Sequence, residues 1–196
     1  MKKTLVMAAV LSVLSLPVFA QSAPATAPAT APAAPAAPAK QMFSFDFADV
    51  CLGAGLSGAT AYTPTAGTVS PVLVFLKDSE AGNYSMRSGQ VPKDWEHTYQ
   101  EVEKTQLVAC LTVKSREKVK DCPFDIEGAT YTAELNNTVY DFVLYEAKTG
   151  KEVLKQSFDQ KAGQCPMFKM FSKKVEVEDA PYKEALTKAI KASVQP

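Results

Sequence analysis

Histidine and tryptophan are scarce in this chain: among 196 residues, His97 is the only imidazole and Trp95 the only indole. A single histidine leaves one imidazole for general acid–base chemistry near neutral pH. No C-x-x-C pair occurs, which disfavours a zinc site built from cysteine and histidine. No nucleophile elbow or comparable signature joins a serine to a histidine and an acid. We therefore expect no catalytic residue and no cofactor.

An excess of charge of one sign is also lacking. Lysine and arginine number 21, as do aspartate and glutamate, so the formal net charge is zero. A near-neutral chain has no overall electrostatic attraction for nucleic acid or for anionic lipid. After residue 20, no apolar run approaches the length of about 20 residues that a membrane-spanning helix needs. We expect no nucleic-acid partner and no membrane span in that part.

The first 20 residues have the three parts of a secretory signal peptide. Lys2 and Lys3 provide the positive start, residues 5–16 the apolar segment, and Val18-Phe19-Ala20 the cleavage site. This pattern predicts export to an extracytoplasmic location, which is the periplasm, the cell envelope or the medium. Residues 21–40, which are rich in alanine and proline, favour extended polyproline II and cannot build a core. They predict a flexible linker, either a spacer or a disordered tail, before a domain over 41–196.

All four cysteines lie after the predicted signal peptide, and an even number in an exported protein indicates two disulfides. The polar stretch "KSREK", residues 114–118, reads as the loop of a hairpin. That loop would place Cys110 directly opposite Cys122, within reach of a cross-strand disulfide. Cys51 and Cys165 would then form the second bridge, although four cysteines allow three pairings.

Strand signals dominate residues 41–178. "MFSFDFADV" alternates phenylalanine with smaller residues, and "PVLVFLK" is a short buried run. "ATYTAEL" and "TVYDFVLYEA" flank Asn136-Asn137, which we read as a turn. In "VLYEAKTGKEV", Gly150 supplies the positive φ of a short hairpin loop. This spacing of strands predicts a mainly β fold, an antiparallel β-sandwich or a barrel-like domain.

The pattern of apolar residues near the end of the chain predicts a helix. "DAPYKEALTKAIKASV", residues 179–194, has apolar residues on one face, with Asp179 as candidate cap and Pro181 in the first turn. This is a C-terminal amphipathic helix that would pack on the sheet. A second, short helix is a candidate in "DWEHTYQEVEK", residues 94–104.

The stretch "CLGAGLSGAT" contains G-x-G-x-x-G, with Asp78 following 20 positions after Gly58. A dinucleotide site needs these glycines between a strand and a helix whose N-terminus holds the pyrophosphate. Pro64, Gly67 and Pro71 leave no room for that helix. We therefore expect no dinucleotide and read the glycines as a tight structural loop, which Cys51 can pin to the domain.

The longest stretch without periodicity, residues 78–94, is the candidate binding region. It contains Tyr84 and Arg87, and Trp95 and His97 follow directly. Trp95 could stack on a ligand or anchor a loop to the core. His97 could act as a base beside Glu96 or remain structural.

The combination of "CLGAGLSGATAY", "LVACL…DCPF", "LYEAKTGKEV" and "GQCPMF" resembles a pattern in a family of uncharacterised exported bacterial proteins with a four-cysteine, β-rich domain. The resemblance covers about residues 51–180. It implies that the cysteines and the Gly150 hairpin are framework, and it implies no activity. We expect a non-enzymatic binding or interaction module of the cell envelope, whose partner is an envelope protein or a surface-layer component. An extracytoplasmic hydrolase or a small-ligand-binding protein is the alternative.

Overall fold

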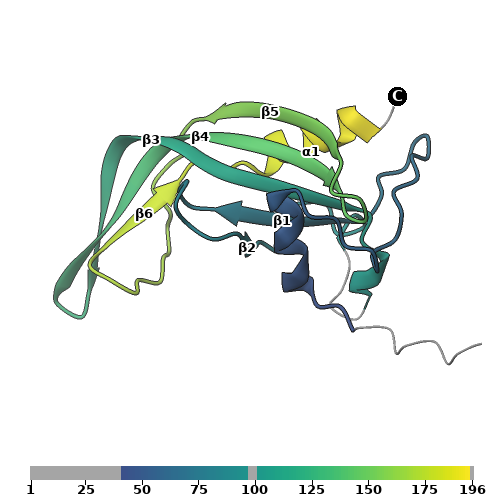
Figure 1. The fold of residues 1–196 in the computed structure, drawn as a ribbon. Coiled ribbons are helices and arrows are strands. Elements are labelled where there is room, and N and C mark those ends of the chain that lie inside the picture. Colours follow the sequence, from purple (N-terminus) through teal and green to yellow (C-terminus); the bar gives the residue numbers. More distant parts are fainter. Residues whose placement is uncertain (1–40, 97–100, 195–196) are drawn as a thin grey trace, which may run out of the picture. The chain divides into compact units, whose positions relative to one another are not determined.

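A computed structural model describes residues 41–96 and 101–194 of the protein (Figure 1). Strands predominate among its elements, and the chain ends in a helix. In chain order the elements are η1 (Ser44–Leu52), β1 (Val72–Lys77), β2 (Ser85–Met86), η2 (Val102–Lys104), β3 (Leu107–Ile126), β4 (Ala129–Glu146), β5 (Glu152–Gln160), β6 (Val175–Asp179) and α1 (Lys183–Val194).

The six strands form one mixed, open sheet in the order β2-β1-β3-β4-β5, with β6 paired to β4 beyond the end of β5. Two pairs are parallel, β1 with β3 and β4 with β6, and the other pairs are antiparallel. The prediction of a mainly β domain with a C-terminal amphipathic helix is confirmed. The strands form a single sheet that does not close into a barrel.

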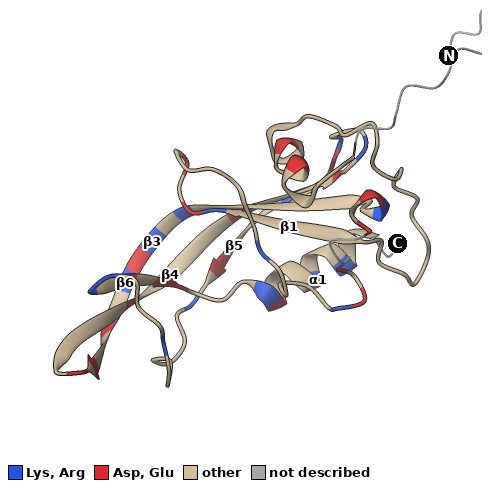
Figure 2. Ribbon diagram, turned by 90° about the horizontal axis from the view of Figure 1, so that it is seen from below, with Lys and Arg blue, Asp and Glu red and all other residues tan. Residues whose placement is uncertain are grey.

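A different helix covers each face of the sheet (Figure 2). Because side chains alternate along a strand, Val74 of β1 and Ala109 of β3 lie on the face of the sheet that α1 covers. There they belong to one buried cluster with Ile190 of the helix. Phe75 of β1 and Phe47 of η1 belong to a second buried cluster on the other face. The proximal sheet therefore has an apolar core on both sides, which explains the continuous apolar run of β1.

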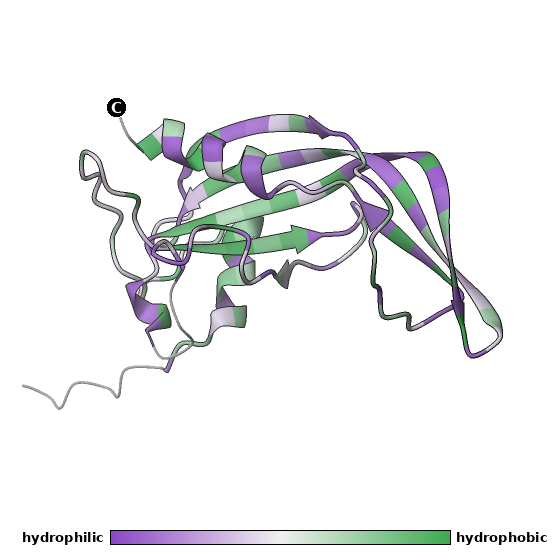
Figure 3. Cartoon of the chain, turned by 180° about the vertical axis from the view of Figure 1, so that it is seen from behind, coloured by the Kyte–Doolittle hydropathy of each residue, from purple (hydrophilic) through white to green (hydrophobic). Residues whose placement is uncertain are grey.

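The long β3–β4 hairpin turns at Glu127-Gly128, where both residues have positive φ, 50° and 77°. The predicted loop at 114–118 is wrong: these residues lie inside β3, and Asn136-Asn137 lies inside β4 rather than in a turn. The polar run is tolerated because the hairpin extends beyond the helices, so its side chains meet solvent (Figure 3). Two register irregularities, after Val113 and after Lys118, interrupt the pairing there.

The strand predicted over residues 42–50 is also wrong, because this segment forms the 3₁₀ helix η1. Phe47 and Val50 are buried at a helical spacing, whereas Phe43 and Phe45 are exposed and stack on each other. Gly53 ends η1 with a φ of 88°. The three phenylalanines fit a period of two, whereas Phe47 and Val50 fit a period of three, and contact with the sheet selects the second.

The predicted disulfide pairing is wrong. Cys51 is bonded to Cys110, and Cys122 is bonded to Cys165. The error follows from the misplaced turn: Cys110 and Cys122 lie on the same strand, where Cys122 is opposite Ala133 of β4. The role of Cys51 in pinning the glycine loop is confirmed, with Cys110 as its partner.

The C-terminal helix forms as predicted, with Leu186, Ile190 and Val194 buried against the sheet. It begins later than expected, at Lys183, so Asp179 is not its cap and belongs to β6. Of the second predicted helix, residues 97–100 lie outside the described residues, and residues 102–104 form the short 3₁₀ helix η2. None of the helices that the structure describes is long and apolar enough to cross a membrane.

The glycine-rich stretch packs against the hairpin turn between β4 and β5. The Leu56 amide donates to the Ala147 carbonyl oxygen at 2.9 Å. A Cβ on Gly55 would lie 2.5 Å from the Lys148 carbonyl oxygen, and Gly150, at φ 69°, faces the Gly53 carbonyl. These glycines serve close backbone packing, and residues 59–71, all of them described, form no helix that could hold a pyrophosphate.

We predict that a tryptic digest of the unreduced protein contains two disulfide-linked peptide pairs. One joins the peptides of Cys51 and Cys110, and the other joins those of Cys122 and Cys165. Lysines separate all four cysteines, so mass spectrometry distinguishes the three possible pairings. A linked pair that contains Cys110 and Cys122 would contradict the fold of β3.

We predict that Gly55→Ala lowers the free energy of unfolding by about 1–3 kcal/mol, the usual cost of forcing atoms into a packed region. Gly163→Ala is the matched control, since a Cβ there meets no atom within 4 Å. It should change the free energy by no more than about 0.5 kcal/mol. Urea denaturation measures both, and equal effects would show that the Gly55 contact is not close.

Candidate functional site

The segment that connects β5 to β6, residues 161–174, is the most unusual surface of the described chain. Its sequence, "KAGQCPMFKMFSKK", contains four lysines and no acid. Three large apolar side chains project from it: Met167 is 103% exposed, Phe168 80% and Met170 81%. We call these three residues the apolar triad. Soluble proteins rarely gather such side chains without a partner surface to cover them.

Lys169 and Phe171, which lie next to Met170 of the triad, point inward and anchor the segment to the rest of the domain. The Lys169 ammonium group binds Glu178 and lies 3.5 Å from Glu176, and its side chain is only 17% exposed. The hydrogen bond to Glu178 is the main cause of the raised pKa of Lys169. The Phe171 ring packs against Phe124 and Tyr131 of the hairpin, at centroid distances of 5.1 and 5.3 Å.

Two further contacts fix this segment to the hairpin and to β6. Cys165 is bonded to Cys122 of β3. The amide and the hydroxyl of Ser172 both donate to Glu176 Oε1 at 2.7 Å, and these hydrogen bonds lower the pKa of Glu176. The apolar triad is thus presented by a segment that is anchored on both sides of it.

A polar groove of about 590 Å³ lies where the chain crosses from β6 to α1, and Lys173, near the end of residues 161–174, is among its lining residues. Its lining includes Asp78, Arg87, Gln90, Arg116, Asp179 and Tyr182. Arg116 and Asp179 form a bidentate ion pair at 2.6 and 2.7 Å, and Arg116 also donates to the Asp78 carbonyl at 2.9 Å. The hydrogen bond with Asp179 is the main cause of the raised pKa of Arg116.

The same crossing is also bonded to β4. The Tyr140 hydroxyl donates to the Ala180 carbonyl at 2.6 Å, and the Thr138 hydroxyl lies 3.3 Å from Asp179 Oδ1. Since Asp179 is engaged by both Arg116 and Thr138, it holds the crossing in place and is not free to bind a ligand.

Arg87 is the residue predicted for binding that does reach the groove. Its Nη2 lies 3.4 Å from Asp78 Oδ1, a long contact, and its buried Nε has no partner among the described residues. Within the described residues, Arg87 is therefore less completely paired than Arg116.

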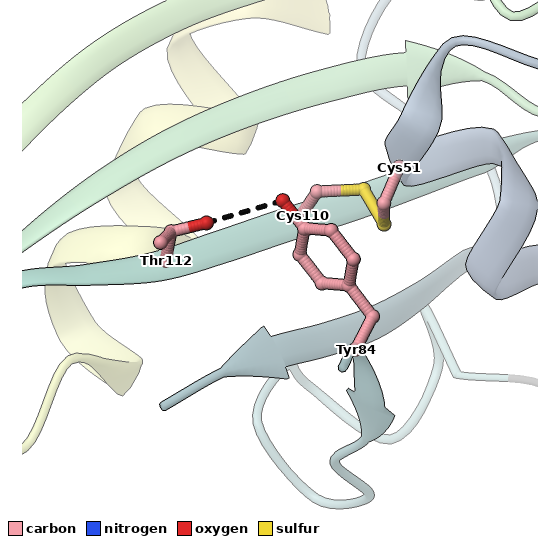
Figure 4. Close-up of a disulfide and its surroundings, with 4 residues drawn as sticks. All are labelled: Cys51, Tyr84, Cys110 and Thr112. Atoms are coloured by element: carbon pink, nitrogen blue, oxygen red, sulfur yellow. Dashed lines mark hydrogen bonds between the residues drawn. A yellow bond between two sulfur atoms is a disulfide. The ribbon is translucent and has the colours of Figure 1, made fainter. Parts of the chain in front are cut away.

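Tyr84, also predicted for binding, belongs to the opposite face of the sheet. It packs in the cluster around the Cys51–Cys110 disulfide, and its hydroxyl lies 3.1 Å from the Thr112 hydroxyl (Figure 4). The Lys77 ammonium lies 5.5 Å from the ring centroid. Tyr84 thus supports the fold around this disulfide.

Trp95 is half-buried and packs against the core on the α1 face. Its carbonyl accepts a hydrogen bond from the Val72 amide at 2.7 Å, which links the preceding loop to β1. His97 lies outside the described residues. The structure therefore does not unite the predicted residues: Arg87 lines the groove, Tyr84 lies on the other face, and Trp95 anchors a loop.

Sequence reasoning missed the apolar triad, although the signal for it was present. "CPMFKMF" is as apolar as a strand, yet it begins with a cysteine and has lysines within it and shortly after it. Which of its side chains point outward becomes visible only in the fold, where Lys169 and Phe171 face partners.

Comparison of the chain with protein-family models, with curated proteins and with solved structures finds no match. Within residues 41–96 and 101–194, no group of three histidine, cysteine, aspartate or glutamate side chains is placed to hold a metal ion. The structure does establish two disulfides, which are typical of oxidising compartments outside the cytoplasm.

We predict that alkaline pH destabilises the protein partly through Tyr182. Burial raises the pKa of Tyr182 to about 12, from about 10 in an unfolded chain. The unfolded state therefore loses its proton first, so stability is complete below pH 10 and falls between about pH 10 and 12.

Tyr182→Phe should reduce this fall, as judged from the urea midpoints at pH 8 and pH 11. Part of the fall should remain, because burial also raises the pKa of Tyr140. An unchanged pH dependence in the variant would contradict the prediction.

Proposed function

We propose that this protein is an exported, non-enzymatic binding module of the cell envelope that contacts its partner through residues 161–174. The observation that carries the proposal is the exposure of Met167, Phe168 and Met170 on a segment anchored through Cys165 and Lys169. Apolar surface of this kind is favourable only when a partner covers it.

The anchoring supports a binding role over simple exposure of a loose loop. A segment that is already ordered loses little conformational entropy on binding, so more of the contact energy is available as affinity. The disulfide and the Lys169 ion pairs supply this order before any partner arrives. The predicted signal peptide, residues 1–20, and the Ala/Pro linker, residues 21–40, agree with a domain displayed outside the cytoplasm.

The resemblance to exported bacterial proteins with a four-cysteine domain supports the same view. The cysteines of its motifs form two disulfides and Gly150 shapes a hairpin turn, as expected of framework residues. One of its motifs, "GQCPMF", lies within residues 161–174 and includes Met167 and Phe168 of the apolar triad.

A small-ligand-binding protein is the second candidate, favoured by the groove. A volume of about 590 Å³ is within the usual range for ligand sites, and Arg87 offers a guanidinium for an anionic group. The binding module remains the better-supported function because Arg116 and Asp179, at the centre of the groove, already satisfy each other.

We predict that the wild-type protein, untagged and expressed in its own cells, is recovered with the envelope fraction. Replacing the apolar triad by serine, as Met167→Ser/Phe168→Ser/Met170→Ser, should move most of it to the soluble fraction. The measurement is quantitative immunoblotting after cell fractionation.

The control variant is Phe45→Ser/Leu52→Ser, which removes two apolar side chains of η1 that are 67% and 74% exposed. It should fractionate as the wild type does. Equal loss in both variants, or no loss in the triad variant, would refute the role of residues 161–174.

A further inference from the structure

We propose that the apolar triad inserts into the surface of an anionic lipid bilayer, with Lys173 and Lys174 at the level of the lipid phosphates. This inference rests on the proposed function, since it names the partner that residues 161–174 contact. The whole chain is formally neutral, but its positive charge is concentrated locally, because residues 161–174 carry four lysines and no acid.

The exposure of the triad favours a bilayer over a protein pocket. Met167 is as accessible as in an isolated peptide, at 103%, and Phe168 and Met170 are nearly so. A bilayer accepts such projecting groups without a matching shape, whereas a protein partner would need a separate socket for each.

The distribution of ion pairs leaves two free cations beside the triad. Lys169 is occupied by Glu176 and Glu178, and Lys161 lies 3.3 Å from Asp159. Lys173 and Lys174 are exposed and form no ion pair within the described residues. Lysines next to apolar side chains place their ammonium groups at the phosphates while the apolar groups enter the acyl boundary.

The acids near the triad set the expected strength. Lys169 supplies one positive charge against the two carboxylates of Glu176 and Glu178, and Asp125 and Glu127 lie at the neighbouring hairpin turn. The unbalanced carboxylates offset part of the attraction of Lys173 for an anionic surface. We therefore expect reversible binding that depends on both the apolar triad and the salt concentration.

The size of each contribution follows from general values. Burying one apolar side chain of this size strengthens binding by roughly ten- to a hundredfold, and one lysine at an anionic surface by roughly fivefold. Removing two apolar side chains should therefore weaken binding more than removing two lysines does.

The experiment measures co-sedimentation of the purified exported protein with lipid vesicles. We expect binding to vesicles of 30% phosphatidylglycerol in phosphatidylcholine, weaker binding to pure phosphatidylcholine, and a loss of the difference in 0.5 M NaCl. Phe168→Ser/Met170→Ser should weaken binding to the anionic vesicles by at least about a hundredfold. Lys173→Gln/Lys174→Gln should weaken it by about tenfold and leave binding to pure phosphatidylcholine unchanged.

The matched charge control is Lys93→Gln/Lys148→Gln, which removes two other exposed lysines without ion pairs in the described part of the chain. It should bind as the wild type does. A variant enters the comparison only if its unfolding midpoint equals that of the wild type, so that loss of fold is not mistaken for loss of binding.

Three outcomes would overturn the inference. Absence of vesicle binding by a wild type that still fractionates with the envelope would identify a protein partner and leave the proposed function intact. A concentration-dependent dimer that Phe168→Ser abolishes, again without vesicle binding, would identify a second copy as the occupant. Absence of both vesicle binding and envelope association would reject the proposed function as well.

Discussion

The pairing of β3 with β4 is the constraint on which the other features of this domain depend. Over its proximal half the hairpin is the centre of the sheet, with β1 on one side and β5 on the other. Over its distal half it continues without α1 or η1, and β6 replaces β5 as the neighbour of β4. A turn at Glu127-Gly128, rather than twelve residues earlier, creates this distal half. The length of β3 sets the positions of Cys110 and Cys122, and therefore the pairing of both disulfides and the position of the segment 161–174.

Each disulfide fixes one added layer to β3. Cys110 holds η1 to the proximal sheet through Cys51, and Cys122 holds residues 161–174 to the distal hairpin through Cys165. The crossing from β6 back to α1 is fixed by a different means, the ion pair between Arg116 and Asp179. The register irregularity after Val113 lies next to Arg116, where the strand leaves the core.

The features that could be predicted from sequence depend on neighbours close in the chain. The buried run of β1, the hairpin at Gly150 and the apolar face of α1 carry their own periodicity or turn chemistry, and each was predicted correctly. The polar residues 114–118 were misread because polarity normally marks a loop, whereas here it marks a strand with solvent on both sides. The disulfide pairing depended on that turn, so one local error changed a long-range conclusion.

The candidate sites could not be predicted because their geometry joins distant segments. Arg87 faces Asp78, which is near in sequence, but the groove also needs Asp179 and Tyr182 from the C-terminal part. For residues 161–174, the sequence gives the composition but not the direction in which each side chain points. Which side chains of "MFKMF" point outward depends on contacts with other segments. Lys169 points inward because it pairs with Glu178, and Phe171 does so because it packs against Phe124.

The distal end shows what the second disulfide contributes to the fold. Its buried core consists of Cys122, Ala133 and Leu135, with Phe124 and Phe171 partly buried beside them. A core this small buries little apolar surface that could stabilise the fourteen residues 161–174. A disulfide that closes a loop of 43 residues contributes about 4 kcal/mol in the chain-entropy model. The bond between Cys122 and Cys165 therefore helps to hold an exposed apolar segment in an ordered structure.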